Sequence, residues 1–229
     1  MTLAAQALTA QAATGGRLTL GIGPSHQPLV EGSLGYRWDR PARHVREYLE
    51  LLDPLLRGDA VDVHGPTVTA VGSIAAPEAA PPPVLLAAHG PVLLKLAGEL
   101  ADGVITTWTG PRGLAEHVVP AVTKAARGIP QVVVGVVASL TADPDGTCAY
   151  VGETFALAGG LPSYRASLDR DGYAGPGDTV VAGDERTIEH SLRRFADAGA
   201  TEFQLCLVGP VEDRARTLAF FGDLARRGW

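Results

Sequence analysis

Short apolar runs alternate with stretches of helical periodicity along most of the chain. The runs are rich in β-branched residues and too continuously apolar for strands with one exposed face, which is typical of parallel strands covered on both faces. We expect five such strands, at residues 17–23, 83–88, 103–108, 131–140 and 202–209.

Between these runs, apolar residues recur at helical spacing, and glycine or proline marks several helix ends. The first helix precedes any strand: Leu3, Ala7, Leu8 and Ala12 share a face that stops at Gly15. Further helices are predicted over 41–56, 91–100, 114–126, a region within 149–168, 184–198 and 211–226.

Strand and helix alternating at intervals of roughly 30 residues predict βαβ units with a parallel sheet. An open doubly wound sheet would be expected to carry G-x-G-x-x-G after a strand, and "GIGPSH" at 21–26 lacks the third glycine. We therefore favour a (β/α)8 barrel and treat 1–229 as a single domain. Residues 59–82 predict an inserted hairpin with a Pro/Ala-rich linker, and 169–178 a mobile loop.

The amino-acid composition and charge limit the classes of molecule that the protein is expected to bind. The 229 residues are 46% hydrophobic and carry a net charge of −6 without a basic cluster, which argues against nucleic acid or anionic lipid and favours a small-molecule substrate. The start has no basic n-region, no apolar run is long enough to cross a bilayer, and the two cysteines suit a reducing cytoplasm, where we expect the protein. No metal-binding motif is present, so no metal site is expected.

One turn predicts an anion site. The strand at 83–88 runs through His89 and Gly90 into a helix beginning at Pro91. Such a turn presents unpaired backbone N–H groups at the positive end of a helix dipole, where phosphate binds readily. We predict that Ala88, His89 and Gly90 bind a phosphate; an ordinary strand-to-helix turn is the alternative.

Several segments together resemble the luciferase-like monooxygenases, in particular the members that use the deazaflavin F420. The resemblance rests on "GIGPSHQP", "REYLELL", "AAHGPVLLKLAGELADGVITTW", "LPSYRASLDRDGYAGPGD" and "GDERTIEHSLRRFADAGATEF", in the family's order. It implies a (β/α)8 barrel whose first three βα units have no counterpart here. Five strands cannot close such a barrel. A late recorded start, a second chain that supplies the missing wall, and a remnant barrel all stay open.

The resemblance implies an F420-dependent oxidoreductase that transfers a hydride to or from a small organic substrate, with the coenzyme's phosphate in the 88–90 turn. Gly23 and Ser25 would contribute to the coenzyme site, and His26 would handle a proton, with an exposed loop histidine as the alternative. An FMN-dependent monooxygenase and a catalytically silent barrel that binds a ligand or partner are the other hypotheses. A homodimer is implied as well.

Three further residues are candidates for the substrate pocket. Trp108 ends the strand at 103–108 and could wall the pocket, although a packed core tryptophan fits the pattern too. Tyr164 and Arg165 could reach over it, Arg165 as a clamp for an anion, whereas a surface helix with solvated charges explains both equally well.

Overall fold

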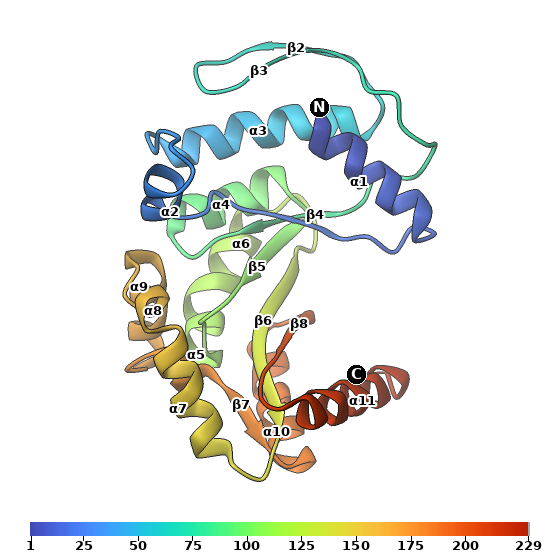
Figure 1. Cartoon of the computed structure of the whole chain (residues 1–229). Helices are drawn as coiled ribbons and strands as arrows, with labels where there is room; N and C mark the ends of the chain where they lie inside the picture. The colour runs from blue at the N-terminus through green and yellow to red at the C-terminus, as the bar shows by residue number, and fades with distance from the viewer. Residues whose placement is uncertain (229) are drawn as a thin grey trace. The chain divides into compact units, whose positions relative to one another are not determined.

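A computed structural model of the chain describes residues 1–228 and contains parallel strands interleaved with helices (Figure 1). Contacts divide it into two compact units, the first Met1–Val104 with Val122–Pro130, the second Ile105–Ala121 with the chain from Gln131 onward. Each unit is described by itself. The single barrel domain expected over 1–229 stays a prediction.

The first unit holds two parallel strands, one hairpin and four helices of six residues or more, followed by the start of β5 and by α6. Strands β1 and β4 pair in parallel, with Leu20 opposite Val84 and Ile22 opposite Leu86. The elements in chain order are α1 (Thr2–Ala13), β1 (Leu20–Ile22), α2 (Gln27–Gly32), α3 (Pro41–Leu56), β2 (Val61–His64), β3 (Thr69–Gly72), β4 (Val84–Ala87), α4 (Pro91–Leu100), β5 (Gly103–Thr106) and α6 (Val119–Ala125). The last two residues of β5 and the first three of α6 belong to the second unit.

The core of the first unit forms where α3 and α4 meet. Helix α3 buries the apolar face that its sequence pattern predicts, including Leu49, Leu52 and Leu55, while its opposite face is charged. Helix α4 packs against α6 so closely that a Cβ on Gly98 would lie 2.5 Å from the carbonyl oxygen of Val122. Only glycine allows this approach.

Residues 59–82 contain the antiparallel hairpin β2–β3, which lies against α3 (Figure 1). The Glu47 carboxylate of α3 accepts hydrogen bonds from the backbone N–H of Thr67 at 2.9 Å and from its hydroxyl at 2.6 Å. The Thr67 hydroxyl is the main cause that lowers the pKa of Glu47 to about 2; the Arg43 guanidinium, 2.8 Å away, adds to it. This carboxylate therefore ties the hairpin to α3.

The second unit is built on the long strand β6, which pairs in parallel with both β7 and β8. The buried Thr217 hydroxyl of α11 accepts the N–H of Leu140 at 2.8 Å, which fixes that helix to the end of β6. The elements are α5 (Pro111–Gly113), the π-helical η1 (Leu114–Val118), β6 (Gln131–Leu140), α7 (Pro144–Thr154), α8 (Ala156–Gly159), α9 (Pro162–Asp171), the 3₁₀ helix η2 (Pro176–Thr179), β7 (Val181–Gly183), α10 (Glu185–Asp197), β8 (Glu202–Leu207) and α11 (Val211–Arg226).

The predicted elements are mostly confirmed, and the pairs β1–β4 and β6–β8 are parallel as expected. Helices α3, α4 and α11 and strand β6 have the predicted bounds. The sequence analysis missed β7 and α2, which are too short to show a period. Outside the hairpin β2–β3, the described residues therefore hold six strands where five were expected. The segment predicted as a mobile loop, 169–178, contains the end of α9 and most of η2, and its mobility stays a prediction.

Candidate functional site

The turn after β4 has the geometry that the anion prediction requires. Gly90 is the N-cap of α4 in an extended conformation, and no side chain caps the helix. The first helical hydrogen bond runs from the N–H of Leu94 to the carbonyl of Gly90 at 3.0 Å, so the N–H groups of Val92 and Leu93 have no partner within the helix. A Cβ on Gly90 would meet nothing within 4 Å. The space that a side chain at Gly90 would take is therefore open.

A second Gly-Pro turn, after β5, shows what such amides bind. Here Gly110 is the N-cap, followed by Pro111, and Leu114 donates to the carbonyl of Gly110 at 3.0 Å. The carboxylate of Asp171, from the end of α9, accepts the N–H of Gly110 at 2.8 Å and that of Gly113 at 3.0 Å. An oxyanion thus occupies the start of this helix, in agreement with its dipole.

The two turns correspond residue by residue, each with glycine at the N-cap and proline at the first helical position. By this correspondence, the N–H groups of Gly90 and Leu93 are the pair that would receive an oxyanion at the start of α4. The two turns differ in what lies beside the N-cap glycine. The chain supplies its own carboxylate at Gly110, whereas the space beside Gly90 is free of protein atoms within 4 Å of a built Cβ.

The loop after β1 lies next to this turn because β1 and β4 are paired neighbours. A Cβ on Gly23 would lie 2.8 Å from the Cβ of Ala87, so only glycine lets the two strand ends approach. Ser25 adopts a left-handed conformation, with φ of 67°, and His26 is the N-cap of α2. The structure thus brings Gly23 beside the segment that holds Ala88, His89 and Gly90.

Burial lowers the pKa of His26 below its usual 6.5. The imidazole is therefore mostly neutral near pH 7 and able to accept a proton. A small pocket of about 350 Å³ opens beside this loop, with Gly23 and Pro24 on one side and His44 and Tyr48 of α3 on the other. Its walls are otherwise apolar.

The three candidates for the substrate pocket lie in the second unit. Trp108 is 7% exposed, has φ of 51°, and packs in a cluster with Val137 and Leu168. Tyr164 meets its ring edge to face at 6.5 Å, and burial raises the pKa of this tyrosine. The Arg165 guanidinium donates to the carbonyls of Tyr173 and Ala174 and pairs with Asp169.

Through these contacts, Arg165 stabilises the chain after α9. Trp108 packs in a hydrophobic core. Whether either also touches a substrate stays a prediction. Sequence reasoning missed Asp171 altogether. Its one signal was the pair of glycines at 110 and 113, which leave room for an oxyanion that a Cβ would meet at 2.5 Å in both positions.

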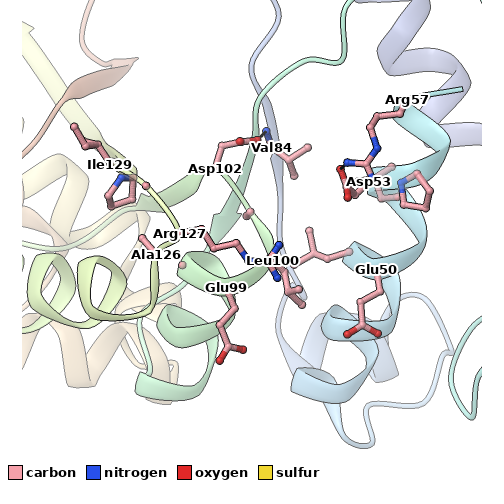
Figure 2. A pocket seen from close by; sticks show the side chains of 17 residues that line it. Glu50, Asp53, Arg57, Val84, Glu99, Leu100, Asp102, Ala126, Arg127 and Ile129 are labelled. Carbon is pink, nitrogen blue, oxygen red and sulfur yellow. Dashed lines mark hydrogen bonds and ion pairs between the residues drawn. The ribbon is translucent and has the colours of Figure 1, made fainter. Parts of the chain in front are cut away.

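A pocket of about 570 Å³ lies at the other end of the first unit (Figure 2). It is lined by the ends of α3 and α4 and by the loop after α6, with Glu50, Asp53, Glu99 and Arg127 labelled in the figure. Asp102, just before β5, accepts the N–H of Val84 at 2.7 Å, so the pocket sits where strands begin. Ligands of parallel α/β folds bind where strands end, and we place no coenzyme here.

The described residues, 1–228, include no helix that is long and apolar enough to span a membrane. The same part of the chain has no group of three or more His, Cys, Asp or Glu side chains arranged to hold a metal ion.

Parallel strands interleaved with helices define an α/β protein, and the uncapped turn at the carboxyl end of β4 is its candidate ligand site. The comparisons with known proteins specify the class: residues 1–224 match the family model of the luciferase-like monooxygenases. The chain belongs to this family, and the resemblance seen in the sequence is confirmed.

Two curated relatives are similar in sequence. The 5,10-methylenetetrahydromethanopterin reductase of Methanolobus tindarius is 28% identical over 202 residues, which are 84% of this chain and 61% of the relative. The F420-dependent glucose-6-phosphate dehydrogenase 1 of Rhodococcus jostii (strain RHA1) is 30% identical over 237 residues, covering 93% of this chain and 70% of the relative. The chain thus spans about three fifths of the first relative's length and 70% of the second's.

Solved structures agree on the fold, which is of the TIM-barrel, luciferase-like type. The coenzyme F420-dependent tetrahydromethanopterin reductase of Methanopyrus kandleri superposes with a TM-score of 0.76 at 22% identity, over 96% of this chain and 77% of that one. The EDTA monooxygenase of Chelativorans sp. BNC1 gives 0.73 at 16% identity, over 99% and 70%.

Proposed function

We propose that the protein is an F420-dependent oxidoreductase that transfers a hydride between F420 and a small organic substrate. The names of sequence relatives support the coenzyme, since relatives from Mycobacterium tuberculosis, Rhodococcus jostii and Mycolicibacterium smegmatis are named as an F420-dependent oxidoreductase and as F420-dependent glucose-6-phosphate dehydrogenases. The observation that carries the proposal is the uncapped Gly90 turn, whose counterpart at Gly110 already holds an oxyanion.

The residues present fit an anionic coenzyme. The N–H groups of Gly90 and Leu93 would hold its phosphate, and Gly23, on the neighbouring strand end, leaves room for the approach of the backbone. When bound, F420 supplies a two-electron acceptor or donor of hydride. His26, neutral near pH 7, would take or return the proton that accompanies the hydride, and Ser25 and His89 complete the predicted site.

The experiment is a titration of the purified chain with F420, followed by fluorescence, in wild type and in Gly90→Val. The backbone at Gly90 is extended and a Cβ there meets no protein atom, so valine should leave the fold intact while its methyls obstruct the oxyanion. Loss of the two amide contacts should weaken binding about tenfold or more. Gly128→Val is the matched control, since a Cβ at Gly128 also meets nothing within 4 Å and the residue lies far along the chain from the turn. A wild-type chain without affinity for F420 would overturn the proposal.

The role of His26 has its own test. If the neutral imidazole accepts the proton, activity should fall as the pH drops through its lowered pKa, and His26→Asn should lose this acid limb while it still binds F420. An unchanged pH profile in the variant would assign the proton transfer to another group.

FMN is the second candidate coenzyme. The observation that favours it is the shared fold with the EDTA monooxygenase and with a riboflavin lyase bound to modified FMN, which superposes with a TM-score of 0.69. A parallel titration with FMN separates the two coenzymes. Affinity for neither would favour the third hypothesis, a catalytically silent barrel.

The homodimer and the small-molecule substrate expected from the resemblance stay proposals. Light scattering on the purified chain would give the mass of the assembly, and a mass of one chain would contradict the homodimer.

A further inference from the structure

The first unit contains a pocket of about 350 Å³ to which the proposed function assigns no ligand. It is lined by the start of α1, the ends of β1 and β4, the loop after β1 and the first half of α3, of which α1, α3 and β4 are labelled in Figure 1. Ligand pockets in proteins measure about 300–1,000 Å³, so this one suits a small molecule. All of its lining residues belong to the same unit.

Most of the residues that line the pocket are apolar. Ile22 of β1 lies opposite Leu86 of β4 in the parallel register, so both side chains leave the sheet on the same face. Helix α3 adds Val45, and α1 adds Leu3. Leu86 and Val45 are buried, whereas Leu3 and Ile22 are partly exposed, as is Pro24 in the loop after β1. A ligand would therefore touch Leu3, Ile22 and Pro24.

Two polar side chains interrupt this apolar lining. His44 and Tyr48 lie one helical turn apart on α3, and their ring centroids are 6.2 Å from each other. Within residues 1–228, the structure shows no hydrogen bond or ion pair of either side chain. Tyr48 is partly exposed, and burial raises the pKa of its phenol, so the phenol stays protonated at neutral pH and can donate a hydrogen bond. The pocket thus offers an unused donor beside apolar walls.

The lining favours a neutral ligand. None of the lining residues within the described chain is a carboxylate, a lysine or an arginine. A charged ligand would lose part of its hydration here without meeting a carboxylate, an ammonium or a guanidinium group.

The Tyr48 phenol adds a second requirement. A ligand without any polar atom would displace water from the phenol and leave it without a partner, which costs free energy. A ligand with an oxygen that accepts a hydrogen bond avoids this cost. The pocket therefore suits a molecule that is mostly apolar and carries one such oxygen.

We propose that this pocket binds a small neutral molecule whose apolar body packs on the partly exposed apolar residues of the lining and whose hydroxyl or carbonyl oxygen accepts a hydrogen bond from Tyr48. Pro24 belongs to the loop that also carries Ser25 and His26, so the ligand contacts the loop of the proposed coenzyme site. The ligand needs no coenzyme for its own contacts. The proposal therefore holds or fails separately from F420 binding.

The test uses the full chain without coenzyme and benzyl alcohol as the probe, with binding followed by shifts of backbone amide signals in a two-dimensional NMR titration. Wild type should bind benzyl alcohol, with shifts at Gly23 and Tyr48. Tyr48→Phe removes the phenol oxygen and keeps the ring, so it should weaken binding about fivefold, the loss of one hydrogen bond. Toluene, which has no oxygen, should bind Tyr48→Phe at least as tightly as wild type. Tyr150→Phe is the matched control: it makes the same change at an exposed tyrosine outside the pocket and should bind benzyl alcohol like wild type.

Thermal melting separates ligand loss from misfolding. Without benzyl alcohol, Tyr48→Phe should melt no lower than wild type, because the phenol that it removes has no hydrogen-bond partner in the described chain. A lower melting temperature for this variant would show that the phenol already has a structural partner and would overturn the argument.

Charged analogues of the probe test the class of ligand. Benzylamine and benzoate keep the ring and carry opposite charges, and both should bind wild type more weakly than benzyl alcohol. Equal or tighter binding of either analogue would overturn the assignment to a neutral ligand. The absence of benzyl alcohol shifts at Gly23 in wild type would overturn the proposal, and so would an equal weakening by Tyr150→Phe or an equal loss of toluene binding in Tyr48→Phe.

Discussion

Replacing Asp171 by alanine tests the reasoning on the Gly-Pro turns without any coenzyme. The substitution removes the acceptor of the N–H groups of Gly110 and Gly113, now at 2.8 and 3.0 Å. A hydrogen bond to a charged group contributes about 1.5–3 kcal/mol. The carboxylate is only partly buried, and water can reach the released amides, so we expect a net loss close to that of a strong N-cap, about 2 kcal/mol.

For a chain of this length, that loss corresponds to a melting temperature lower by about 4–8 °C. Asp171→Asn, which keeps one acceptor oxygen and the shape, should lose about half as much. Thermal melting followed by circular dichroism measures both variants.

The vacated turn should then accept an oxyanion from solution. We expect added sulfate to raise the melting temperature of Asp171→Ala more than that of wild type or of Asp171→Asn, because sulfate can replace the lost carboxylate at the same amides. An unchanged melting temperature in Asp171→Ala, or an equal response of all three proteins to sulfate, would refute the idea that these turns are oxyanion sites and would weaken the reading of Gly90.

Three further predictions concern the two units. Gly98→Ala should destabilise the protein by about 1–3 kcal/mol in chemical denaturation, because the new Cβ would lie 2.5 Å from a backbone oxygen of α6; stability equal to wild type would contradict the packing. Thr217→Val should cost about 1–3 kcal/mol by the same assay, since it leaves the buried N–H of Leu140 unpaired. The stability that Glu47 contributes should be complete above pH 4.5, its usual pKa, and should be lost as the pH falls towards 2, because the folded state holds the pKa of Glu47 at about 2. Melting temperatures of Glu47→Gln, measured across the same pH range, should lack this acid-dependent loss. An acid profile identical to that of wild type would contradict the prediction.

The turn at Gly90 and Pro91 shows how much of the candidate site could be predicted from the sequence. The Gly90-Pro91 pair and the strand before it were sufficient to predict an uncapped helix start, because both features are local. The role of Asp171 was out of reach, since 61 residues separate it from Gly110 and no spacing rule connects them.

The sequence alone determined the order of most elements, the bounds of α3, α4, β6 and α11, and the parallel pairing of the predicted strands. These follow from periodicity and from proline and glycine, which act within a few residues. Only the tertiary structure decided that Asp171 fills one Gly-Pro turn while the space beside Gly90 stays open, and that Glu47 holds the hairpin. Such contacts join residues far apart in sequence, and their geometry depends on how strands and helices pack, which no local pattern encodes.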